Sequence, residues 1–160
     1  MVWLLLSCVV ILALATVLRG APYVPTHGHQ VELALDTLEL KAGERLVDIG
    51  SGDGRVLLTA ARRGLKATGY EINPLLCVLS WLRSRRYRSQ ITIVWGDVWS
   101  KKLPSDTRGV FIFTMGRFMP KVEHKIKAQG LRNIKLASYG FEIPGRKPLK
   151  RAGAVILYEI

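Results

Sequence analysis

The sequence holds few of the residues that build disulfide frameworks or metal sites. Among its 160 residues are only two cysteines, Cys8 and Cys77, and only three histidines. A disulfide framework needs several cysteine pairs, and a structural zinc site needs a full set of Cys or His ligands. The sequence therefore excludes both classes, and we expect no metal.

Acidic residues are also scarce, with 12 Asp and Glu against 24 Lys and Arg, which gives a net charge of +12. This charge coexists with a hydrophobic fraction of 49% because the first 20 residues are almost entirely apolar, Arg19 being the only charge among them. The remaining residues have the apolar content of an ordinary soluble domain. We therefore divide the chain into an apolar leader, expected to be a transmembrane anchor, at 1–20 and one globular domain at 21–160.

The leader contains seventeen uncharged residues, from Val2 to Leu18. As a helix that rises about 1.5 Å per residue, they reach about 26 Å, near the lower limit for crossing a bilayer. We expect an uncleaved single-pass anchor, with the domain on the cytoplasmic side, or on the matrix side if the protein is mitochondrial, because the positive charges follow the leader. Two alternatives stay open: a cleaved signal peptide, since Ala13–Ala15 resembles a cleavage site, and an apolar element packed on the domain.

In the rest of the chain, short apolar runs alternate with helical patterns. Val31, Leu35 and Leu38 recur at helical spacing, and this periodicity returns over 55–63 and 74–87. Runs typical of buried strands occupy 45–50, 66–71, 91–95, 109–114, 134–139 and 155–158. Strands that alternate with helices form βαβ units. The pattern therefore predicts an α/β fold with a doubly wound, mainly parallel sheet.

A glycine-rich loop follows the first predicted strand, in the sequence Val47-Asp-Ile-Gly-Ser-Gly-Asp-Gly-Arg55. Glycines at such a turn let the backbone approach a ligand closely, and open α/β sheets bind ligands at this crossover. The spacing differs from the G-x-G-x-x-G of dinucleotide-binding proteins, and Asp53 would place a negative charge where a pyrophosphate binds. The G-x-x-x-x-G-K-[ST] loop of nucleotide triphosphatases is absent from the sequence. The loop therefore favours a different kind of ligand.

Two further acidic residues follow predicted strands. Glu71 ends the second strand, where a carboxylate can accept hydrogen bonds from both hydroxyls of a ribose, and Asp97 follows the third strand, within reach of an adenine amino group. Each acid alone also fits a solvated loop, but their recurrence at successive strand ends favours one shared ligand. The residues indicate a ligand with a ribose, a purine and a zwitterionic head.

These features together resemble the class I S-adenosylmethionine-dependent methyltransferases, over about residues 23–160. Val47–Arg55 is similar to the first motif of that superfamily, Tyr70–Pro74 to its acidic ribose motif and Gly96-Asp97 to its adenine motif. The resemblance implies a Rossmann-like methyltransferase core and S-adenosyl-L-methionine as the cofactor. The residues that would bind it are Asp48, Gly50, Ser51, Gly52, Asp53, Glu71, Asn73 and Asp97.

A narrower resemblance adds the apolar leader and the segment Pro22-Tyr-Val-Pro-Thr26. It is to the small membrane-anchored protein-lysine methyltransferases, whose eukaryotic members modify the adenine nucleotide translocase and the ATP synthase c-ring protein. The chain departs from that pattern over Phe113–Pro120, where the family is more apolar. Since only one strand is predicted after 134–139, we expect the last helix and hairpin of the fold to be trimmed at the C-terminus.

The catalytic residues stay unassigned. Methyl transfer is an in-line displacement that depends on positioning, and a lysine acceptor with a pKa near ~10.4 must first lose its proton. The candidates that would line the acceptor pocket are Tyr23, Thr26, His27, Met115 and Met119. His27 is a candidate base, although a loop histidine of this kind is more often simply exposed. No Asn/Asp-Pro-Pro-Tyr follows the fourth strand, which argues against methylation of the amino group of adenine or of glutamine. No Pro-Cys occurs, which excludes a covalent mechanism on cytosine.

Basic residues are concentrated in the last third of the chain and over 83–88. A polybasic surface beside a membrane anchor binds anionic headgroups, whereas an RNA methyltransferase would use it to bind RNA. The leader favours the first interpretation. Trp81, Trp95 and Trp99 are expected in the core rather than as platforms for stacked bases.

The sequence therefore predicts a methyltransferase that modifies a lysine of a membrane or membrane-associated protein, and that contacts the membrane through its leader and its basic surface. The alternatives are an RNA or small-molecule methyltransferase and a non-catalytic module that binds S-adenosylmethionine.

Overall fold

The computed structural model describes Trp3 and residues 25–160. The helices are α2 (Gly28–Leu38), α3 (Arg55–Arg62), α4 (Pro74–Ser84) and α5 (Met119–Ala128), with short 3₁₀ helices η1 (Arg85–Tyr87), η2 (Val98–Ser100) and η3 (Gly116–Phe118). The strands are β1 (Arg45–Ile49), β2 (Lys66–Glu71), β3 (Ile91–Trp95), β4 (Thr107–Ile112), β5 (Lys135–Tyr139), β6 (Lys150–Ala152) and β7 (Val155–Glu159).

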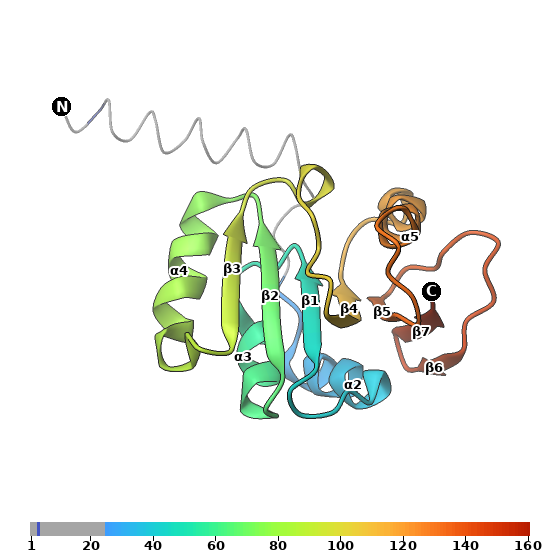
Figure 1. Ribbon diagram of the computed structural model, residues 1–160, viewed down its shortest axis with the longest axis horizontal. Coiled ribbons are helices and arrows are strands. Elements are labelled where there is room, and N and C mark those ends of the chain that lie inside the picture. Colours follow the sequence, from blue (N-terminus) through green and yellow to red (C-terminus); the bar gives the residue numbers. More distant parts are fainter. Residues whose placement is uncertain (1–2, 4–24) are drawn as a thin grey trace.

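The strands of the described residues form one sheet in the order β3-β2-β1-β4-β5-β7-β6 (Figure 1). β1 to β5 run parallel, whereas β7 pairs antiparallel with β5 and β6. Because β1 lies between β2 and β4, the strand order reverses there. Open α/β sheets bind ligands at the carboxyl ends of their strands beside such a reversal. The predicted doubly wound, mainly parallel fold is confirmed, and the glycine-rich loop lies at the reversal.

The C-terminal part of the fold differs from the prediction. We predicted a trimmed hairpin, which is wrong, because β6 and β7 form an antiparallel hairpin at the edge of the sheet. β6 is only three residues long and mostly exposed. Its Lys-Arg-Ala sequence therefore lacks the apolar pattern from which a strand is predicted. β4 also begins earlier than predicted, since Thr107 pairs with Arg45. The segment 140–149 contains no helix, as expected.

The sheet divides the core into two hydrophobic clusters. Consecutive residues of one strand belong to opposite clusters: Leu46 and Phe111 lie with α2 and α3, whereas Val47 and Val110 lie with α5. Parallel strands that are buried on both faces read as continuous apolar runs. This is why the first and fourth strands were visible in the sequence.

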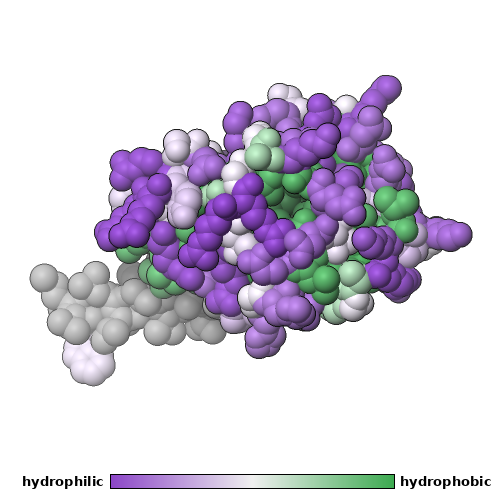
Figure 2. All heavy atoms as spheres, turned by 90° about the horizontal axis from the view of Figure 1, so that it is seen from below, coloured by the Kyte–Doolittle hydropathy of each residue, from purple (hydrophilic) through white to green (hydrophobic). Residues whose placement is uncertain are grey.

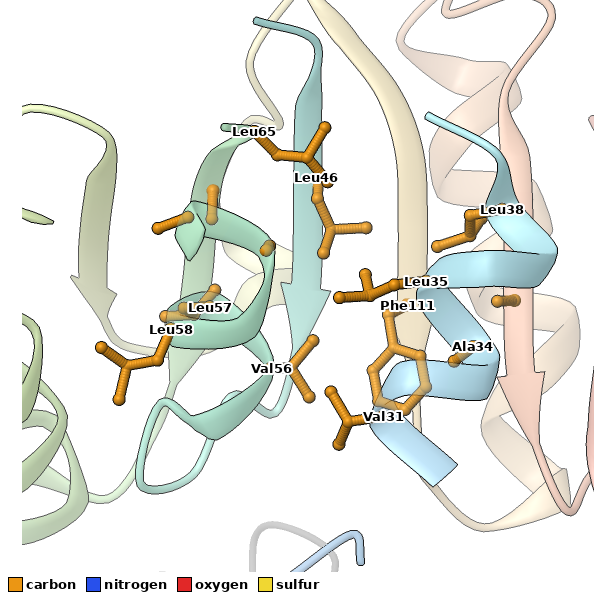
Figure 3. Close-up of a cluster of buried hydrophobic side chains, with 14 of the residues drawn as sticks. Val31, Ala34, Leu35, Leu38, Leu46, Val56, Leu57, Leu58, Leu65 and Phe111 are labelled. Atoms are coloured by element: carbon orange, nitrogen blue, oxygen red, sulfur yellow. The ribbon is translucent and has the colours of Figure 1, made fainter. Parts of the chain in front are cut away.

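The helix α2 covers the sheet with the apolar residues that its periodicity predicts. Val31, Leu35 and Leu38 are buried, and Figure 3 shows Val31 and Leu35 beside Phe111 of β4. Burying a side chain of this size stabilises the fold by about 1.5–3 kcal/mol. The packing fixes the start of α2, and therefore the segment directly before it, relative to the sheet.

The predicted membrane anchor falls at 1–20, which apart from Trp3 lies outside the described residues. Among Trp3 and residues 25–160, we find no helix with the length and apolar character needed to cross a bilayer. This finding contradicts the predicted single-pass localisation, including the cytoplasmic or matrix orientation that rested on it. Seen from below, at the amino ends of β1–β3, the surface is largely hydrophilic, with apolar residues in small separate places (Figure 2).

The middle of β2 approaches the glycine-rich loop more closely than a side chain allows. A Cβ atom on Gly69 would lie 2.6 Å from Ser51 Oγ and 2.6 Å from Leu57 Cδ1. Ser51 belongs to the loop and Leu57 to α3. The loop can therefore occupy this position only because Gly69 of the neighbouring strand has no side chain.

We predict that Gly69→Ala lowers the free energy of unfolding by about 1–3 kcal/mol, because the added methyl group overpacks a filled position. Urea unfolding followed by circular dichroism measures this change. Gly28→Ala is the matched control: its Cβ would meet no atom within 4 Å, so stability should be unchanged or slightly higher. Equal midpoints for wild type and Gly69→Ala would contradict the packing argument.

Candidate functional site

The glycine-rich loop between β1 and α3 is open on one side and tightly packed on the other. Gly50 has a φ of 79°, a conformation that favours glycine, and a Cβ there would meet no atom within 4 Å. A Cβ on Gly54, by contrast, would collide with Ser80 Oγ of α4. The loop therefore offers an accessible backbone at its start and anchors α4 at its end.

The carboxylate of Glu71 ties the end of β2 to this loop. Its Oε2 accepts a hydrogen bond from the backbone N–H of Gly52 at 2.8 Å, and its Oε1 accepts one from the N–H of Asn73 at 2.8 Å. The Asn73 side chain in turn caps α4 by accepting from the N–H of Leu75 at 2.9 Å. A carboxylate has about four lone-pair sites. Glu71 therefore keeps the capacity to accept further hydrogen bonds from a ligand.

The carboxyl group of Asp48 lies beneath the loop and is not fully hydrogen-bonded. Asp48 is 2% exposed, and its Oδ2 atom has no hydrogen-bond partner, nor has Ser51 Oγ nearby in the sequence. Burial, reinforced by the negative charges of Glu71 and Asp53, raises the pKa of Asp48 to about 8. Unpaired buried polar groups are rare in folded proteins. Their presence beside the loop indicates a place for a polar ligand.

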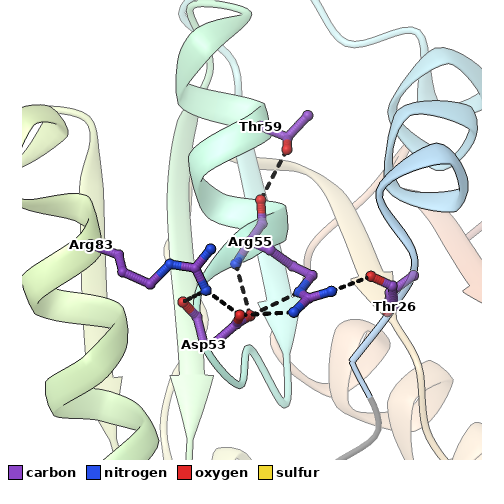
Figure 4. A network of polar contacts seen from close by, with 5 residues as sticks. All are labelled: Thr26, Asp53, Arg55, Thr59 and Arg83. Atoms are coloured by element: carbon purple, nitrogen blue, oxygen red, sulfur yellow. Dashed lines mark hydrogen bonds and ion pairs between the residues drawn. The ribbon is translucent and has the colours of Figure 1, made fainter.

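Asp53 is the centre of an ion-pair network that joins four parts of the chain (Figure 4). Its carboxylate accepts from Arg55 Nε at 3.0 Å and Nη2 at 2.9 Å, and also pairs with Arg83 of α4. Arg55 Nη1 donates to the backbone carbonyl of Thr26 at 2.8 Å. Burial alone would raise the pKa of Asp53, but the two guanidinium groups outweigh it and hold this pKa below its usual range. The network fixes the loop, α4 and the segment before α2 together.

Asp97 follows β3 at the same edge of the sheet, since Trp95 is in register with Glu71. Its side chain is exposed and accepts a hydrogen bond from the N–H of Trp99 at 3.0 Å, which caps η2. The structure thus brings the predicted residues of three strand ends to one edge. Asp48 and Glu71 are buried there, whereas Asp97 lies at its outer side.

The candidates for the acceptor pocket are placed differently from one another. Tyr23 lies outside the described residues. Thr26 is buried and held through its carbonyl, and His27 is exposed at the start of α2. Met115 is half-buried before η3, but Met119 is fully buried in the core, where Ser138 Oγ lies 3.6 Å from its Sδ. Met119 therefore packs in the core and does not reach the surface.

Sequence reasoning missed two features of the site. It did not predict that Arg55 and Arg83 pair with Asp53, because these contacts are not visible in the sequence: Arg83 lies 30 residues after Asp53, and Arg55 also contacts Thr26, 29 residues before it. It also expected Trp81 and Trp95 in the core, but their exposed fractions are 59% and 65%. That expectation is wrong for both residues, whereas Trp99 is half-buried.

Comparisons with known proteins place these residues in a family. Residues 48–150 match the family described as the ANTKMT methyltransferase domain. The chain belongs to this family. The match begins at Asp48 and ends at the start of β6, so it contains the glycine-rich loop, Glu71 and Asp97. Thr26 and His27 precede the part that matches the ANTKMT methyltransferase domain.

Individual relatives agree with this assignment. The chain is 35% identical over 131 residues to the lysine N-methyltransferase of the ATP synthase C-subunit from Xenopus laevis, covering 79% of this chain and 56% of that protein. It is 33% identical over 135 residues to the adenine nucleotide translocase lysine N-methyltransferase of Mus musculus, covering 82% and 58%. A protein-lysine N-methyltransferase of Saccharolobus islandicus is 28% identical over 131 residues, covering 79% and 81%. The chain therefore spans little more than half the length of the two animal relatives.

Solved structures share the fold of this ANTKMT-family chain. An RNA methyltransferase from Salinibacter ruber in complex with S-adenosyl-L-homocysteine superposes with a TM-score of 0.77 at 23% identity, over 84% of this chain and 91% of that chain. A methyltransferase from Thiobacillus denitrificans, also bound to S-adenosyl-L-homocysteine, gives 0.59 at 20% identity, over 74% and 49%. At these identities the likeness establishes the fold alone.

The raised pKa of Asp48 predicts a stability that depends on pH. Between the ordinary value of 3.8 and about 8, the folded protein holds a proton that the unfolded chain releases. The free energy of unfolding should therefore fall as the pH rises through this window. We predict that the loss between pH 5 and pH 7.5 is about 1–3 kcal/mol smaller in Asp48→Asn, as measured by urea unfolding at both values.

Asp106→Asn is the matched control for this prediction, because Arg45 holds the pKa of Asp106 below its usual range. Asp106 stays ionised between pH 5 and pH 7.5 in both states, so its variant should keep the wild-type dependence. An Asp48→Asn variant with the same pH dependence as wild type would show that the buried carboxyl group is already ionised.

Proposed function

We propose that this protein is an S-adenosylmethionine-dependent protein-lysine N-methyltransferase whose acceptor is a lysine of a membrane or membrane-associated protein. The observation that carries the proposal is membership of the ANTKMT methyltransferase-domain family. Relatives at 33–35% identity are named as lysine N-methyltransferases of the ATP synthase C-subunit and of the adenine nucleotide translocase. The buried carboxyl groups and the open loop at one edge of the sheet support the same activity.

The residues at this edge fit S-adenosyl-L-methionine. The loop is open at Gly50, and Asp48 Oδ2 and Ser51 Oγ lack partners that a polar ligand would supply. When bound, the cofactor supplies a methyl group activated by a positively charged sulfur. Glu71 would hold the ribose hydroxyls and Asp97 the adenine amino group. The zwitterionic head would lie over the loop residues Gly50, Ser51, Gly52 and Asp53 and over Asp48, with Asn73 holding Glu71 in place.

The charges of the site suit a cationic ligand. Asp48, Asp53 and Glu71 are all buried, and they lie at one edge of the sheet. An ammonium group near Asp48 favours the ionised carboxylate and so opposes the effect of burial on its pKa. A pyrophosphate at the same place would be repelled. The site therefore selects for the sulfonium and ammonium groups of the cofactor rather than for a dinucleotide.

On the acceptor side of the proposed site, the described candidates are Thr26, His27 and Met115. The network of Asp53 and Arg55 holds the Thr26 carbonyl, so the segment before α2 is fixed relative to the loop. Methyl transfer needs a neutral lysine nitrogen placed in line with the sulfur–methyl bond. This chain contributes the positioning, and the exposed His27 is available to accept the proton that the lysine loses.

An RNA acceptor is the second candidate, and the net charge of +12 is the observation that favours it. A basic surface binds phosphates irrespective of sequence. We place it second because the named relatives at 33–35% identity act on protein lysines. The non-catalytic alternative, a module that only binds the cofactor, is distinguished by whether a methyl group is transferred at all.

Isothermal titration calorimetry with S-adenosylmethionine tests the cofactor site. We predict that Glu71→Gln weakens binding at least tenfold, because hydrogen bonds to a charged acceptor contribute about 1.5–3 kcal/mol each. Glu142→Gln is the control, since Glu142 is exposed and pairs with Arg151 far from the loop. Binding by wild type that Glu71→Gln leaves unchanged would reject the assignment of Glu71 to the ribose.

Labelling with methyl-tritiated cofactor tests the acceptor. The full chain is incubated with isolated membranes and, separately, with total RNA. We expect label in a membrane-fraction protein, on a lysine identified by mass spectrometry of the labelled band. Label found only in RNA would establish the second candidate, and cofactor binding without label in either fraction would support the non-catalytic module.

A further inference from the structure

The helix α4 buries its small polar residues and exposes its large apolar ones. The buried residues of this helix are Ser80 and Ser84. The exposed ones, between 43% and 59% accessible, are Leu75, Val78, Leu79, Trp81 and Leu82. Four of them follow the i, i+3, i+4, i+7 spacing and therefore share one face. A surface helix of a globular domain normally has the opposite arrangement, with its apolar stripe on the core.

The packing of α4 on the glycine-rich loop explains why its inner side is small and polar. Gly54 approaches Ser80 so closely that a Cβ on the glycine would collide with Ser80 Oγ. Ser84 Oγ donates to the carbonyl of Trp81 within the same helix. A larger side chain at the position of Ser80 would therefore collide with the loop. Exposed apolar side chains do not stabilise the fold through burial. The apolar face of α4 therefore needs a separate explanation.

Trp95 of β3 extends the exposed apolar surface beyond the helix. It is 65% exposed, and its Nε1 donates to the carbonyl of Ile72, just before α4, at 3.1 Å. β3 is the edge strand of the sheet, and α4 lies beside it at the outer end of the molecule (Figure 1). We call these six side chains, the five apolar residues of α4 and Trp95, the α4 surface. Contiguous exposed apolar groups of this kind mark interaction sites.

Positive charge flanks the α4 surface. From 72 to 96 the chain contains four arginines and no acidic residue. Arg83 pairs with Asp53, but within residues 25–160 no carboxylate forms an ion pair with Arg85, Arg86 or Arg88, all of which are exposed. These three residues follow directly on the apolar face, in and after η1. The surface is therefore apolar in its middle and cationic at one end, without compensating negative charge.

We propose that the α4 surface attaches the protein to the interface of a bilayer that contains anionic lipids. Leucines and tryptophans of an interfacial helix lie at the boundary of headgroups and acyl chains, and adjacent arginines pair with anionic headgroups. A single helix at the edge of a sheet is convex, which suits a deformable lipid surface. A second copy of this chain would bring the same arginine-rich, acid-free segment and no negative charge. The attachment crosses no bilayer and does not depend on methyl transfer.

Fluorescence quenching by lipids with brominated acyl chains tests whether α4 reaches the membrane. The full chain is mixed with phosphatidylcholine vesicles with and without phosphatidylserine. We expect quenching with the anionic vesicles, and we expect Trp81→Phe to remove a measurable share of it, because Trp81 is an exposed member of the α4 surface. Trp99→Phe, at a half-buried position, is the control and should leave the quenching in place. Quenching that Trp81→Phe does not reduce would overturn the proposal.

Vesicle sedimentation tests the charge and apolar contributions. The double variant Arg86→Gln, Arg88→Gln should lower the partition coefficient about 25-fold, since each arginine near an anionic surface contributes about fivefold. The control Arg132→Gln, Lys147→Gln removes equal charge from exposed positions elsewhere and should change it less than twofold. Leu79→Ser, Leu82→Ser should also lose binding, with an unchanged urea midpoint because both side chains are exposed.

Other outcomes would identify a different occupant. An equal loss in the two charge variants would show that net charge alone binds the vesicles and would reject α4 as the site. A wild-type dimer in analytical ultracentrifugation that Leu79→Ser, Leu82→Ser dissociates would assign the surface to a second copy. Calorimetry of the same variants with S-adenosylmethionine separates these results from a failure of the proposed reaction, because the cofactor site should be unaffected.

Discussion

The buried carboxylate of Asp53 holds the functional edge of this protein together. It pairs with Arg55 at the start of α3 and with Arg83 of α4, and Arg55 extends the connection to the Thr26 carbonyl before α2. Removing one partner of a fully buried ion pair costs about 3–5 kcal/mol. The cost is smaller here, because the Arg55 and Arg83 side chains are 33% and 42% exposed and water screens their charges. The loop that Asp53 belongs to can therefore keep the N–H of Gly52 directed at Glu71 without help from a ligand. Preorganisation of this kind lowers the cost of binding.

The same packing links the site to the outer surface of α4. Gly54 and Ser80 allow the loop and the helix to approach closely, and Asn73 caps the helix directly after Glu71. A helix that is placed by small residues on its inner side has its large residues left for the outside. The contacts with the site thus fix the orientation of α4. A surface bound by α4 would be held at a set angle to the carboxyl edge, so an acceptor in that surface would meet the site in a limited range of orientations.

The parts of the site that local sequence encodes were predictable, and the parts that depend on distant contacts were not. Parallel strands buried on both faces give apolar runs, and their ends meet at one edge, so Asp48, Glu71 and Asp97 could be grouped from the sequence alone. β6 was missed because a short, exposed edge strand needs no apolar alternation. The outward position of Trp81 was missed because an inverted amphipathic helix has the same periodicity as an ordinary one. Trp95 was missed because it ends β3, an edge strand whose apolar run does not show which residue stays uncovered. Periodicity shows that a helix has two faces, but only packing shows which of them is buried.

The acidic residues of this basic protein are unevenly distributed between its interior and its surface. Within the described residues, the only buried charged side chains are Asp48, Asp53 and Glu71, and all three lie at the carboxyl edge. Because these three carboxyl groups are withdrawn from the surface, the solvent-facing side of the domain is more strongly basic than the net charge of +12 suggests. The chain therefore separates two electrostatic tasks. In the proposed function, the carboxyl edge would receive a cationic sulfonium and an amine, while the basic exterior would attract an anionic partner. The raised pKa of Asp48 reflects the first task, since a carboxyl group crowded by burial and two other acids ionises most readily when a cation arrives beside it.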